Sequence, residues 1–194
     1  MYFHPDETII EVNKNDILFR DFHAIKYVYF VIEGTFKVYK YSEDGVEKIV
    51  DILTDNDYLA VTLMFGSKKD YGLNCSALSK SKVVKVTVNQ MFEAFVDRKI
   101  LKDYMHFTSR KLINFKNYLA NSTDVEERII IALRELYDRF GKEVQGVKTI
   151  YLPFSKTDLA SFIGLRRETL SRKLSILVSE GKIEVDKNKI LLNI

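Results

Sequence analysis

The sequence has one cysteine, Cys75, and three histidines, His4, His23 and His106. A single cysteine excludes an intrachain disulfide and any zinc or iron–sulfur site that needs several cysteines of the chain. The histidines lie far apart, without the short spacings that are typical of metal sites. We therefore predict no metal, no cofactor and no metalloenzyme chemistry.

Long apolar runs are also missing. No run approaches the roughly 20 residues that a membrane-spanning helix needs. The N-terminal residues MYFHPDETII lack the basic and then apolar layout of a signal peptide. Apolar residues make up 46% of the chain and charged residues 29%, which is typical of a soluble globular protein. We expect a cytoplasmic location and no membrane partner.

Excess charge is small, because the 194 residues carry a net charge of only +3. Any affinity for nucleic acid must then come from the local placement of charge. Such a concentration occurs at residues 164–175, which hold four basic residues and one acidic residue, Glu168.

The first half of the chain has the composition of β-strands. Residues 26–41, KYVYFVIEGTFKVYKY, are rich in β-branched and aromatic residues, with Gly34 as a bend, and Asp44-Gly45 is a hairpin signal. Further short strands are expected at residues 16–19, 73–77 and 83–88. Many short strands at regular spacing predict a sandwich, roll or barrel.

A long helical pattern follows. Residues 90–121 contain no glycine or proline, and apolar residues recur at steps of three and four. The stripe consists of Leu101, Tyr104, Thr108, Leu112, Phe115 and Leu119. An identical helix of a second subunit is the simplest partner for it, and the alternative is the chain's own β-domain. A second helix is expected from Thr123, with Glu126 completing a capping box, to Phe140, where Gly141 supplies a left-handed cap. Residues 141–154 read as a loop that leads into a short strand.

Residues 155–194 predict a winged helix-turn-helix. Ser155 and Asp158 form a capping-box variant, Phe154 and Leu159 suit a hydrophobic staple, and Gly164 suits a turn with positive φ. The first helix, residues 156–163, turns Leu159, Ala160 and Ile163 inward. The second helix runs from Arg166 or Arg167 to about Ser179 and buries Leu170, Leu174, Leu177 and Val178. Two short strands around residues 186–189 form the wing.

The inward leucines leave one end of the second helix exposed. Arginine can bind guanine through O6 and N7, and a carboxylate can accept from cytosine N4. Other polar side chains suit phosphates, which fix register rather than sequence. We predict base contacts from Arg167, Glu168, Ser171 and Arg172, and phosphate contacts from Arg166, Thr169 and Lys173. The alternative is a solvated helix face, which would tend to mix charges of both signs.

Residues 157–183, TDLASFIGLRRETLSRKLSILVSEGKI, resemble the DNA-binding signature of the Crp/Fnr family of bacterial transcription regulators. Residues 15–39, NDILFRDFHAIKYVYFVIEGTFKVY, resemble its β-roll, and residues 90–121 its dimerisation helix. The resemblance implies an α+β fold with an N-terminal β-roll (a double-stranded β-helix like that of cyclic-nucleotide-binding domains) over residues 1–95. It further implies a long dimerisation helix over residues 96–122 and a C-terminal winged helix-turn-helix over residues 123–194. Such a protein is a homodimer that binds palindromic double-stranded DNA, has RNA polymerase as a partner and is not an enzyme.

The resemblance also implies a target sequence. Arg167, Glu168 and Arg172 match the base-contacting positions of the cyclic-AMP receptor branch, and Glu168, Ser171 and Arg172 spell the E-x-x-S-R pattern of the Fnr branch. Both branches read half-sites that contain TGA, so we expect a TGA-containing inverted repeat.

The sensor half departs from the family pattern. Where cyclic-nucleotide binders have Gly-Glu for the ribose, NDYLAV has Ala60 and Val61, and Tyr71 or Leu73 stands where they have the phosphate-binding arginine. A buried phosphate without a cationic partner is strongly disfavoured, so we expect no response to cyclic AMP.

The effector therefore remains unknown. An Fnr-type iron–sulfur sensor needs four cysteines. Three alternatives stay open: haem bound through His106 or Cys75, redox sensing by Cys75, and no ligand at all. If Cys75 has no sensing role, we expect it to be a small buried hydrophobic residue. A different small ligand would bind between the roll and the long helix, near Tyr58, Tyr71, Cys75 and Tyr104. A cupin-type enzyme, the remote alternative, needs clustered histidine and carboxylate ligands that this sequence does not offer.

Overall fold

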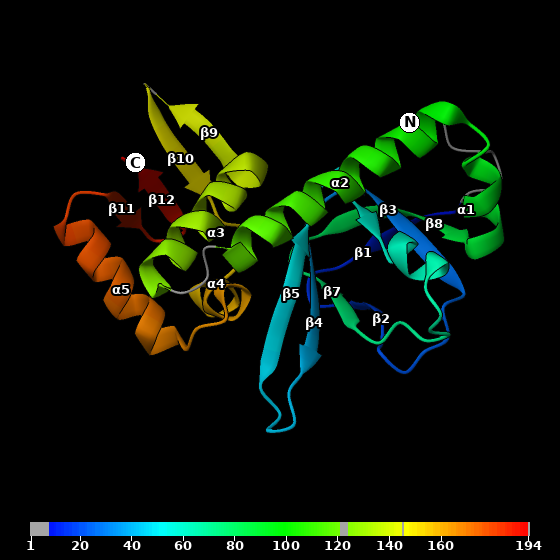
Figure 1. Ribbon diagram of the computed structural model, residues 1–194, viewed down its shortest axis with the longest axis horizontal. Coiled ribbons are helices and arrows are strands. Elements are labelled where there is room, and N and C mark those ends of the chain that lie inside the picture. The colour runs from blue at the N-terminus through cyan, green and yellow to red at the C-terminus, as the bar shows by residue number, and fades with distance from the viewer. Residues whose placement is uncertain (1–7, 121–123, 145, 194) are drawn as a thin grey trace. The chain divides into compact units, whose positions relative to one another are not determined.

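The computed structural model describes residues 8–120, 124–144 and 146–193 (Figure 1). The chain forms two compact units, Met1–Ile113 and Asn114–Ile194, and the division falls inside helix α2 (Arg98–Ala120). The boundary expected at residues 121–123 lies outside the described residues. The division into residues 1–95, 96–122 and 123–194 stays a prediction.

The first unit is a β-roll of two four-stranded sheets, in the orders β1-β8-β3-β6 and β2-β7-β4-β5. All of the strand pairs are antiparallel. Apolar side chains from both sheets form a shared core, which includes Val31, Phe36, Leu59 and Val83. The strands are β1 (Thr8–Val12), β2 (Ile17–Phe19), β3 (Tyr27–Glu33), β4 (Phe36–Tyr41), β5 (Glu47–Leu53), β6 (Tyr58–Leu59), β7 (Asn74–Ala77) and β8 (Ser81–Thr87).

The expected turns of the roll are confirmed. Gly34 separates β3 from β4 at a φ of 112°, and Gly45 lies in the turn between β4 and β5 at a φ of 77°. Gly34 also lies against Ser81, so a Cβ at this position would overlap that side chain. The short strands β1 and β6 were not predicted. Their pairing with β8 and β3 depends on contacts with residues far away in the sequence.

The prediction of one unbroken helix over residues 90–121 is wrong. The structure has two helices, α1 (Val88–Ala94) and α2. The Asp97 carboxylate accepts a hydrogen bond from the backbone N–H of Lys99 at 2.7 Å, and the Asp97 carbonyl accepts from Leu101 at 3.0 Å. Asp97 thus begins a new helix in the way that N-cap residues do.

The predicted apolar stripe on α2 needs one correction. Tyr104 is only 4% exposed, because it packs into the chain's own roll beside Tyr58 and Met91. The exposed residues instead follow steps of three and four through Met105: Leu101, Met105, Leu112, Phe115 and Leu119, with the half-buried Thr108 between them. Tyr104 thus follows the alternative in which the stripe packs on the chain's own β-domain, whereas pairing with a second subunit stays a prediction for the exposed residues.

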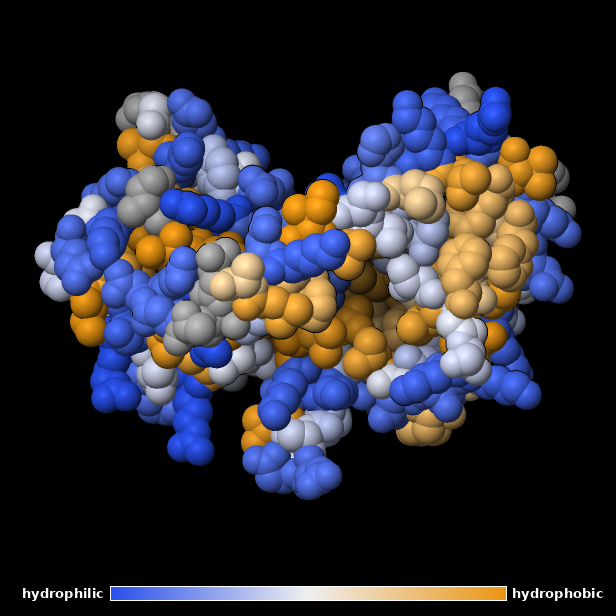
Figure 2. Space-filling model, viewed as in Figure 1, coloured by the Kyte–Doolittle hydropathy of each residue, from blue (hydrophilic) through white to orange (hydrophobic). Residues whose placement is uncertain are grey.

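A second group of apolar residues is exposed at the end of the roll formed by α1 and the 3₁₀ helix η1 (Val61–Phe65). Figure 2 shows apolar side chains gathered there, at the right of the view. The Phe65 ring lies 5.6 Å from that of Phe92 and 6.1 Å from those of Phe95 and Tyr104. These contacts join η1, α1 and α2.

The second unit combines three helices with a four-stranded sheet in the order β11-β12-β10-β9. Buried Leu133, Ile150, Leu159 and Leu177 belong to its core. Its elements after α2 are α3 (Val125–Phe140), β9 (Gly141–Val144), β10 (Val147–Tyr151), α4 (Lys156–Ile163), α5 (Arg167–Ser179), β11 (Ile183–Asp186) and β12 (Lys189–Leu192).

Helix α3 ends at Phe140 as predicted, but both of its predicted caps need correction. The helix has its N-cap at Asp124, without a side-chain cap bond, and the expected cap Thr123 lies outside the described residues. Gly141 has a φ of −81° and begins β9, so it is not a left-handed cap and the expected loop is a β-hairpin. A Cβ at Gly141 would overlap the ring and carbonyl of Tyr137, so glycine is required here by space.

Candidate nucleic-acid interface

The start of α4 is fixed by the predicted capping box. The Ser155 hydroxyl accepts from the Asp158 N–H at 3.1 Å, and the Asp158 carboxylate accepts from the Ser155 N–H at 3.1 Å. Phe154 and Leu159, the predicted staple pair, are both buried. Two backbone donors of the first turn are thus satisfied, and α4 begins at Lys156 as predicted.

The turn between α4 and α5 has the predicted geometry. Gly164 adopts a φ of 73° and a ψ of 35°, which is the left-handed region that glycine enters at low energy. The Leu165 N–H then donates to the Ala160 carbonyl at 2.8 Å, and Ala160 itself is buried. The short turn leads directly into α5, which completes a helix-turn-helix.

Leucines position α5 against the rest of the second unit. Leu170, Leu174 and Leu177 are at most 5% exposed, as predicted. The prediction that Val178 is buried is wrong, since 42% of it is exposed. At about 100° per residue, Val178 lies roughly 80° around the helix from Leu170, at the edge of the buried face.

The predicted reading residues gather at the N-terminal end of α5. Their side chains make no hydrogen bond or ion pair with any residue that the structure describes. This end of α5 is therefore available to a partner, and the contacts of its single residues stay predictions. Arg166, Arg167, Glu168, Ser171 and Arg172 are exposed, and Thr169 and Lys173 are half-buried.

The wing is the β11–β12 hairpin, with Asp186 paired to Lys189 across its turn. Just before β11, the Lys182 ammonium donates to Glu126 of α3 at 2.6 Å and lies 2.8 Å from a Glu180 carboxylate oxygen. These hydrogen bonds hold the wing's first strand near α3 and raise the pKa of Lys182 above its ordinary value.

The positions expected to correspond to the family's nucleotide-binding residues carry apolar and phenolic side chains in this chain. Ala60 has a φ of 63°, and Val61 is 1% exposed within the apolar core. The Tyr71 hydroxyl donates to the Tyr27 carbonyl at 2.6 Å, and its ring stacks on Phe19 at a centroid distance of 4.2 Å. Neither position offers the carboxylate or the cation that a cyclic nucleotide needs.

The four predicted effector residues are buried but fall into two clusters. Tyr58 and Tyr104 contact each other, with ring centroids 5.3 Å apart. Tyr71 and Cys75 belong to the other cluster, between the sheets. Burial raises the pKa of the Tyr58 and Tyr104 hydroxyls and of the Cys75 thiol. The structure therefore does not bring all four residues together, and the effector pocket stays a prediction.

The described residues include neither a metal-binding cluster nor a membrane-spanning helix. Within residues 8–120, 124–144 and 146–193, no three His, Cys, Asp or Glu side chains are grouped to hold a metal ion. The helices in the same ranges include none whose length and apolar character would suit a membrane crossing.

Two family models match the chain. The model of the cyclic nucleotide-binding domain matches residues 9–98, and that of the Crp-like helix-turn-helix domain matches residues 127–193. A β-roll followed by a Crp-like helix-turn-helix defines a class of DNA-binding transcription regulator. The chain belongs to the Crp/Fnr family of these regulators.

Relatives support this assignment along most of the chain. The Electron transport regulator A of Shewanella oneidensis is 24% identical, over 93% of this chain and 73% of its own length. A CRP-like cAMP-activated global transcriptional regulator of Mycobacterium tuberculosis is 24% identical, over 86% of this chain and 75% of its own. The relatives are transcription regulators and not enzymes.

Solved structures share the fold. FixK2 from Bradyrhizobium japonicum superposes with a TM-score of 0.79 at 23% identity, covering 97% of this chain and 93% of that one. The roll, the long helix and the helix-turn-helix domain are thus confirmed as the α+β architecture predicted from the sequence.

Proposed function

We propose that this regulator binds DNA as a homodimer and recognises an inverted repeat whose half-sites contain TGA. The observation that carries the proposal is the exposed N-terminal end of α5, where Arg167, Glu168 and Arg172 have no partner among the described residues. Arginine can bind guanine O6 and N7, and a carboxylate can accept from cytosine N4. The G·C pair of a TGA half-site presents both groups in the major groove.

The exposed stripe of α2 supports the homodimer. Leu101, Met105, Leu112, Phe115 and Leu119 are each at least 39% exposed, and their spacing is that of a coiled-coil seam. A two-fold pair of such helices would present two copies of α5 to half-sites about one helical turn of DNA apart.

The interior of the roll supports independence from cyclic AMP. Val61 is buried where the family's ribose-binding carboxylate stands, and the Tyr71 hydroxyl is engaged with the Tyr27 carbonyl. A phosphate placed there would lose its hydration without gaining a cation. The cyclic-AMP activation in the name of the M. tuberculosis relative therefore does not transfer to this chain.

The alternative of a thiol switch at Cys75 is not favoured. Cys75 has no exposed surface, and burial raises the pKa of its thiol, which keeps it protonated and unreactive at neutral pH. Regulation by a small ligand of another kind remains the second candidate. A cytoplasmic location and RNA polymerase as a partner stay predictions from the family resemblance.

Selection of bound duplexes from a random pool, with and without cell extract, tests the proposal. Purified protein should enrich a TGA-containing palindrome without extract. Enrichment only with extract would support an obligatory ligand, and no enrichment in either arm would overturn DNA recognition. Protein carrying Arg172→Ala is the matched control and should enrich a palindrome that is degenerate at one position of each half-site.

A further inference from the structure

The corner between α5 and β11 is fixed to the end of α5 by its own backbone. Gly181 has a φ of 69°, and its N–H donates to the Val178 carbonyl at 3.0 Å. The Lys182 N–H donates to the Leu177 carbonyl at 3.0 Å, and Ile183, which begins β11, has no exposed surface. A bond made by the Lys182 side chain therefore acts on the end of α5.

The Lys182 side chain connects this corner to α3. Its ammonium donates to Glu126 at 2.6 Å and lies 2.8 Å from a carboxylate oxygen of Glu180. Glu126 lies in the first turn of α3, which is anchored in the core by the fully buried Ile129 and Leu133. Apolar packing is not directional, whereas a hydrogen bond between charged groups fixes a distance and an orientation. The contact of Lys182 with Glu126 thus adds a directional link between α3 and the end of α5.

The start of α5 has a separate contact with a preceding helix. Gly164 lies in the turn before α5, and the Tyr118 hydroxyl of α2 is 3.9 Å from the position that a Cβ on Gly164 would take. Both residues belong to the second unit. This contact and the one made by Lys182 lie at opposite ends of α5, a helix of 13 residues and about 20 Å. Two such points define the direction of the helix.

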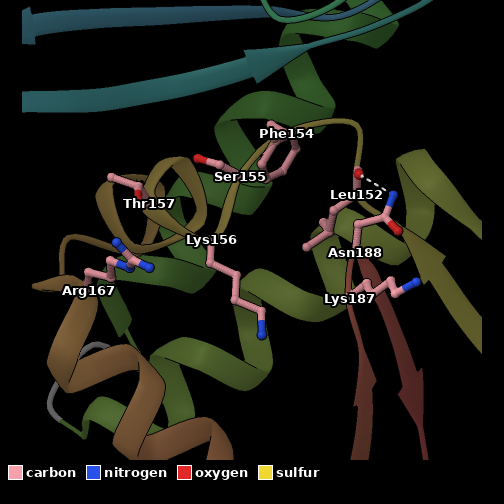
Figure 3. A pocket seen from close by; sticks show the side chains of 8 residues that line it. All are labelled: Leu152, Phe154, Ser155, Lys156, Thr157, Arg167, Lys187 and Asn188. Carbon is pink, nitrogen blue, oxygen red and sulfur yellow. Dashed lines mark hydrogen bonds between the residues drawn. The ribbon is translucent and has the colours of Figure 1, made fainter.

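The turn of the wing is fixed by other bonds. The Asn188 side-chain amide donates to the Leu152 carbonyl at 3.3 Å, as Figure 3 shows, and the Leu152 N–H donates to the Asn188 carbonyl at 2.9 Å. Leu152 lies just before α4, so these bonds do not involve α3. The wing should therefore keep its fold when the contact between Lys182 and α3 is removed.

The charge of Lys182 is neutralised within the protein. Two carboxylates, those of Glu126 and Glu180, face its single ammonium group. Attraction of DNA phosphates depends on cations that can replace the counterions of the DNA, and a neutralised lysine contributes little to it. Lys182 differs in this respect from the exposed Arg172, whose side chain has no partner among the described residues.

We infer that Lys182 is a positioning residue for DNA recognition, whose contact with Glu126 fixes the separation of the two copies of α5 in the dimer. Helix α3 begins five positions after the end of α2, the proposed dimerisation helix, so a link from α5 to α3 relates the reading helix to the two-fold axis. Without this link, each α5 still reads its own half-site, but the dimer accepts more than one spacing of the half-sites. This inference rests on the proposed function.

The test uses full-length protein and three duplexes. They are the selected palindrome, the same palindrome with one base pair inserted between its half-sites, and a duplex with a single half-site. The inserted base pair moves the second half-site by about 3.4 Å and rotates it by about 35°. Affinities are measured by fluorescence anisotropy, and the ratio of the affinities for the first two duplexes is the spacing preference.

Two variants remove the contact from its two sides, Lys182→Gln and Glu126→Ala. Each should reduce the spacing preference about two- to fivefold, the factor that a partly exposed ion pair supports, and should leave the affinity for the single half-site unchanged. Lys182→Arg keeps a charged donor and should keep the preference. Lys142→Gln is the matched control and should behave like the wild type, because Lys142 is an exposed lysine on β9, at the opposite edge of the sheet from β11.

An unchanged spacing preference in Lys182→Gln would overturn the inference. A phosphate contact would give another pattern, in which Lys182→Gln weakens binding to all three duplexes alike and lowers the salt slope by about 0.9, while Glu126→Ala strengthens binding. Equal losses on the palindrome and on the single half-site without a change in salt slope would assign Lys182 to the folding of the unit. Either pattern would also overturn the inference. If the wild type binds none of the duplexes, the proposed function itself fails.

Discussion

Arg110 of α2 donates a hydrogen bond from Nη2 to Oδ1 of Asp57 in the roll at 2.9 Å. The Asp57 side chain is only 3% exposed, whereas that of Arg110 is 62% exposed. The other carboxylate oxygen of Asp57 accepts from the Thr54 N–H at 3.0 Å. On the next residue, the Lys111 ammonium binds both oxygens of Asp51 at 2.6 Å. Two cations that are adjacent in the sequence thus link α2 to the roll.

Loss of the Arg110 side chain should destabilise the first unit. Arg110→Gln leaves the buried Asp57 with one partner fewer, and an incompletely paired buried group costs about 1–3 kcal/mol. The exposure of Arg110 places the expected loss in the free energy of unfolding at the lower end of that range. This loss is measured by denaturant unfolding of the wild type, of Arg110→Gln and of the control Lys102→Gln. Lys102 is an exposed lysine on the same helix. Equal losses in the two variants would show that the ion pair contributes nothing.

Charge placed on the exposed stripe of α2 should abolish the dimer. Leu112→Glu and Phe115→Glu put like charges on both sides of a two-fold seam, where they repel each other and lose apolar burial. Analytical ultracentrifugation should find a dimer for the wild type and a monomer for each variant. His106→Glu, about 140° around the helix from the stripe, should remain dimeric. A wild-type monomer at micromolar concentration would contradict the proposed assembly.

Cyclic AMP should leave the melting temperature unchanged. A ligand present at about 1,000 times its Kd stabilises the folded state by about 4 kcal/mol, which would shift the melting temperature by several degrees. With Val61 buried and Tyr71 bonded to a carbonyl, we expect no shift at millimolar cyclic AMP. A concentration-dependent rise would show that the roll still binds the nucleotide.

Stability should fall at alkaline pH, in part through Cys75. Burial raises the pKa of the thiol in the folded state, so the unfolded state loses its proton first, near the ordinary value of 9.0. The stabilising contribution is then fully present below about pH 9 and is lost as the pH rises above it, by up to about 1.4 kcal/mol per pH unit. Buried Tyr29, Tyr58 and Tyr71, whose pKa values are also raised by burial, should add to the fall at higher pH.

The contribution of Cys75 to this pH dependence is measured by denaturant titrations of the wild type and of Cys75→Ala between pH 7 and 10. The variant should be less stable at pH 7 because of the cavity, but its stability should decline less steeply above pH 9. Parallel pH profiles would contradict the assignment. A thiol reagent that labels native protein as fast as unfolded protein would contradict the burial of Cys75 and revive the redox switch.

The helix-turn-helix could be predicted almost residue by residue because its signals are local. The bonds between Ser155 and Asp158 span three residues, and Gly164 needs its positive φ whatever surrounds it. The predictions that were wrong concerned features that depend on tertiary contacts, or features whose local sequence signal was overlooked. Tyr104 and Thr108 both fit the α2 stripe, and only the packing of Tyr104 against Tyr58 shows which way that side of the helix faces.

Some of the missed features have a signal in the sequence, and others have none. Asp97 is a residue type that favours the N-cap, so the sequence did contain a signal for the break before α2. The absence of glycine and proline from residues 90–121 nevertheless favoured one continuous helix. Position 141 requires glycine because a Cβ there would overlap Tyr137, and no sequence pattern reveals this close approach. The contact between Lys182 and Glu126 joins residues 56 positions apart and was missed, since the corner after α5 approaches α3 only in the folded unit.

The phosphate contact predicted for Lys173 can be distinguished from a base contact by its effect on DNA affinity. Lys173→Ala should weaken binding to all sequences alike and lower the salt slope by about one contact, because phosphates carry no direct sequence information. Anisotropy titrations on the palindrome and on a scrambled duplex measure both effects. A loss confined to the palindrome would instead assign Lys173 to a base.

The most direct test of DNA reading is the affinity of Arg172→Ala for a panel of duplexes in which each base pair of the half-site is changed in turn. The exposed Arg172 on α5 should contribute about 1–3 kcal/mol at one position. The variant should therefore lose that affinity on the intact palindrome and become indifferent to the base pair at that position, while its other preferences persist. An equal loss on every duplex of the panel would contradict the assignment of α5 as the helix that reads bases.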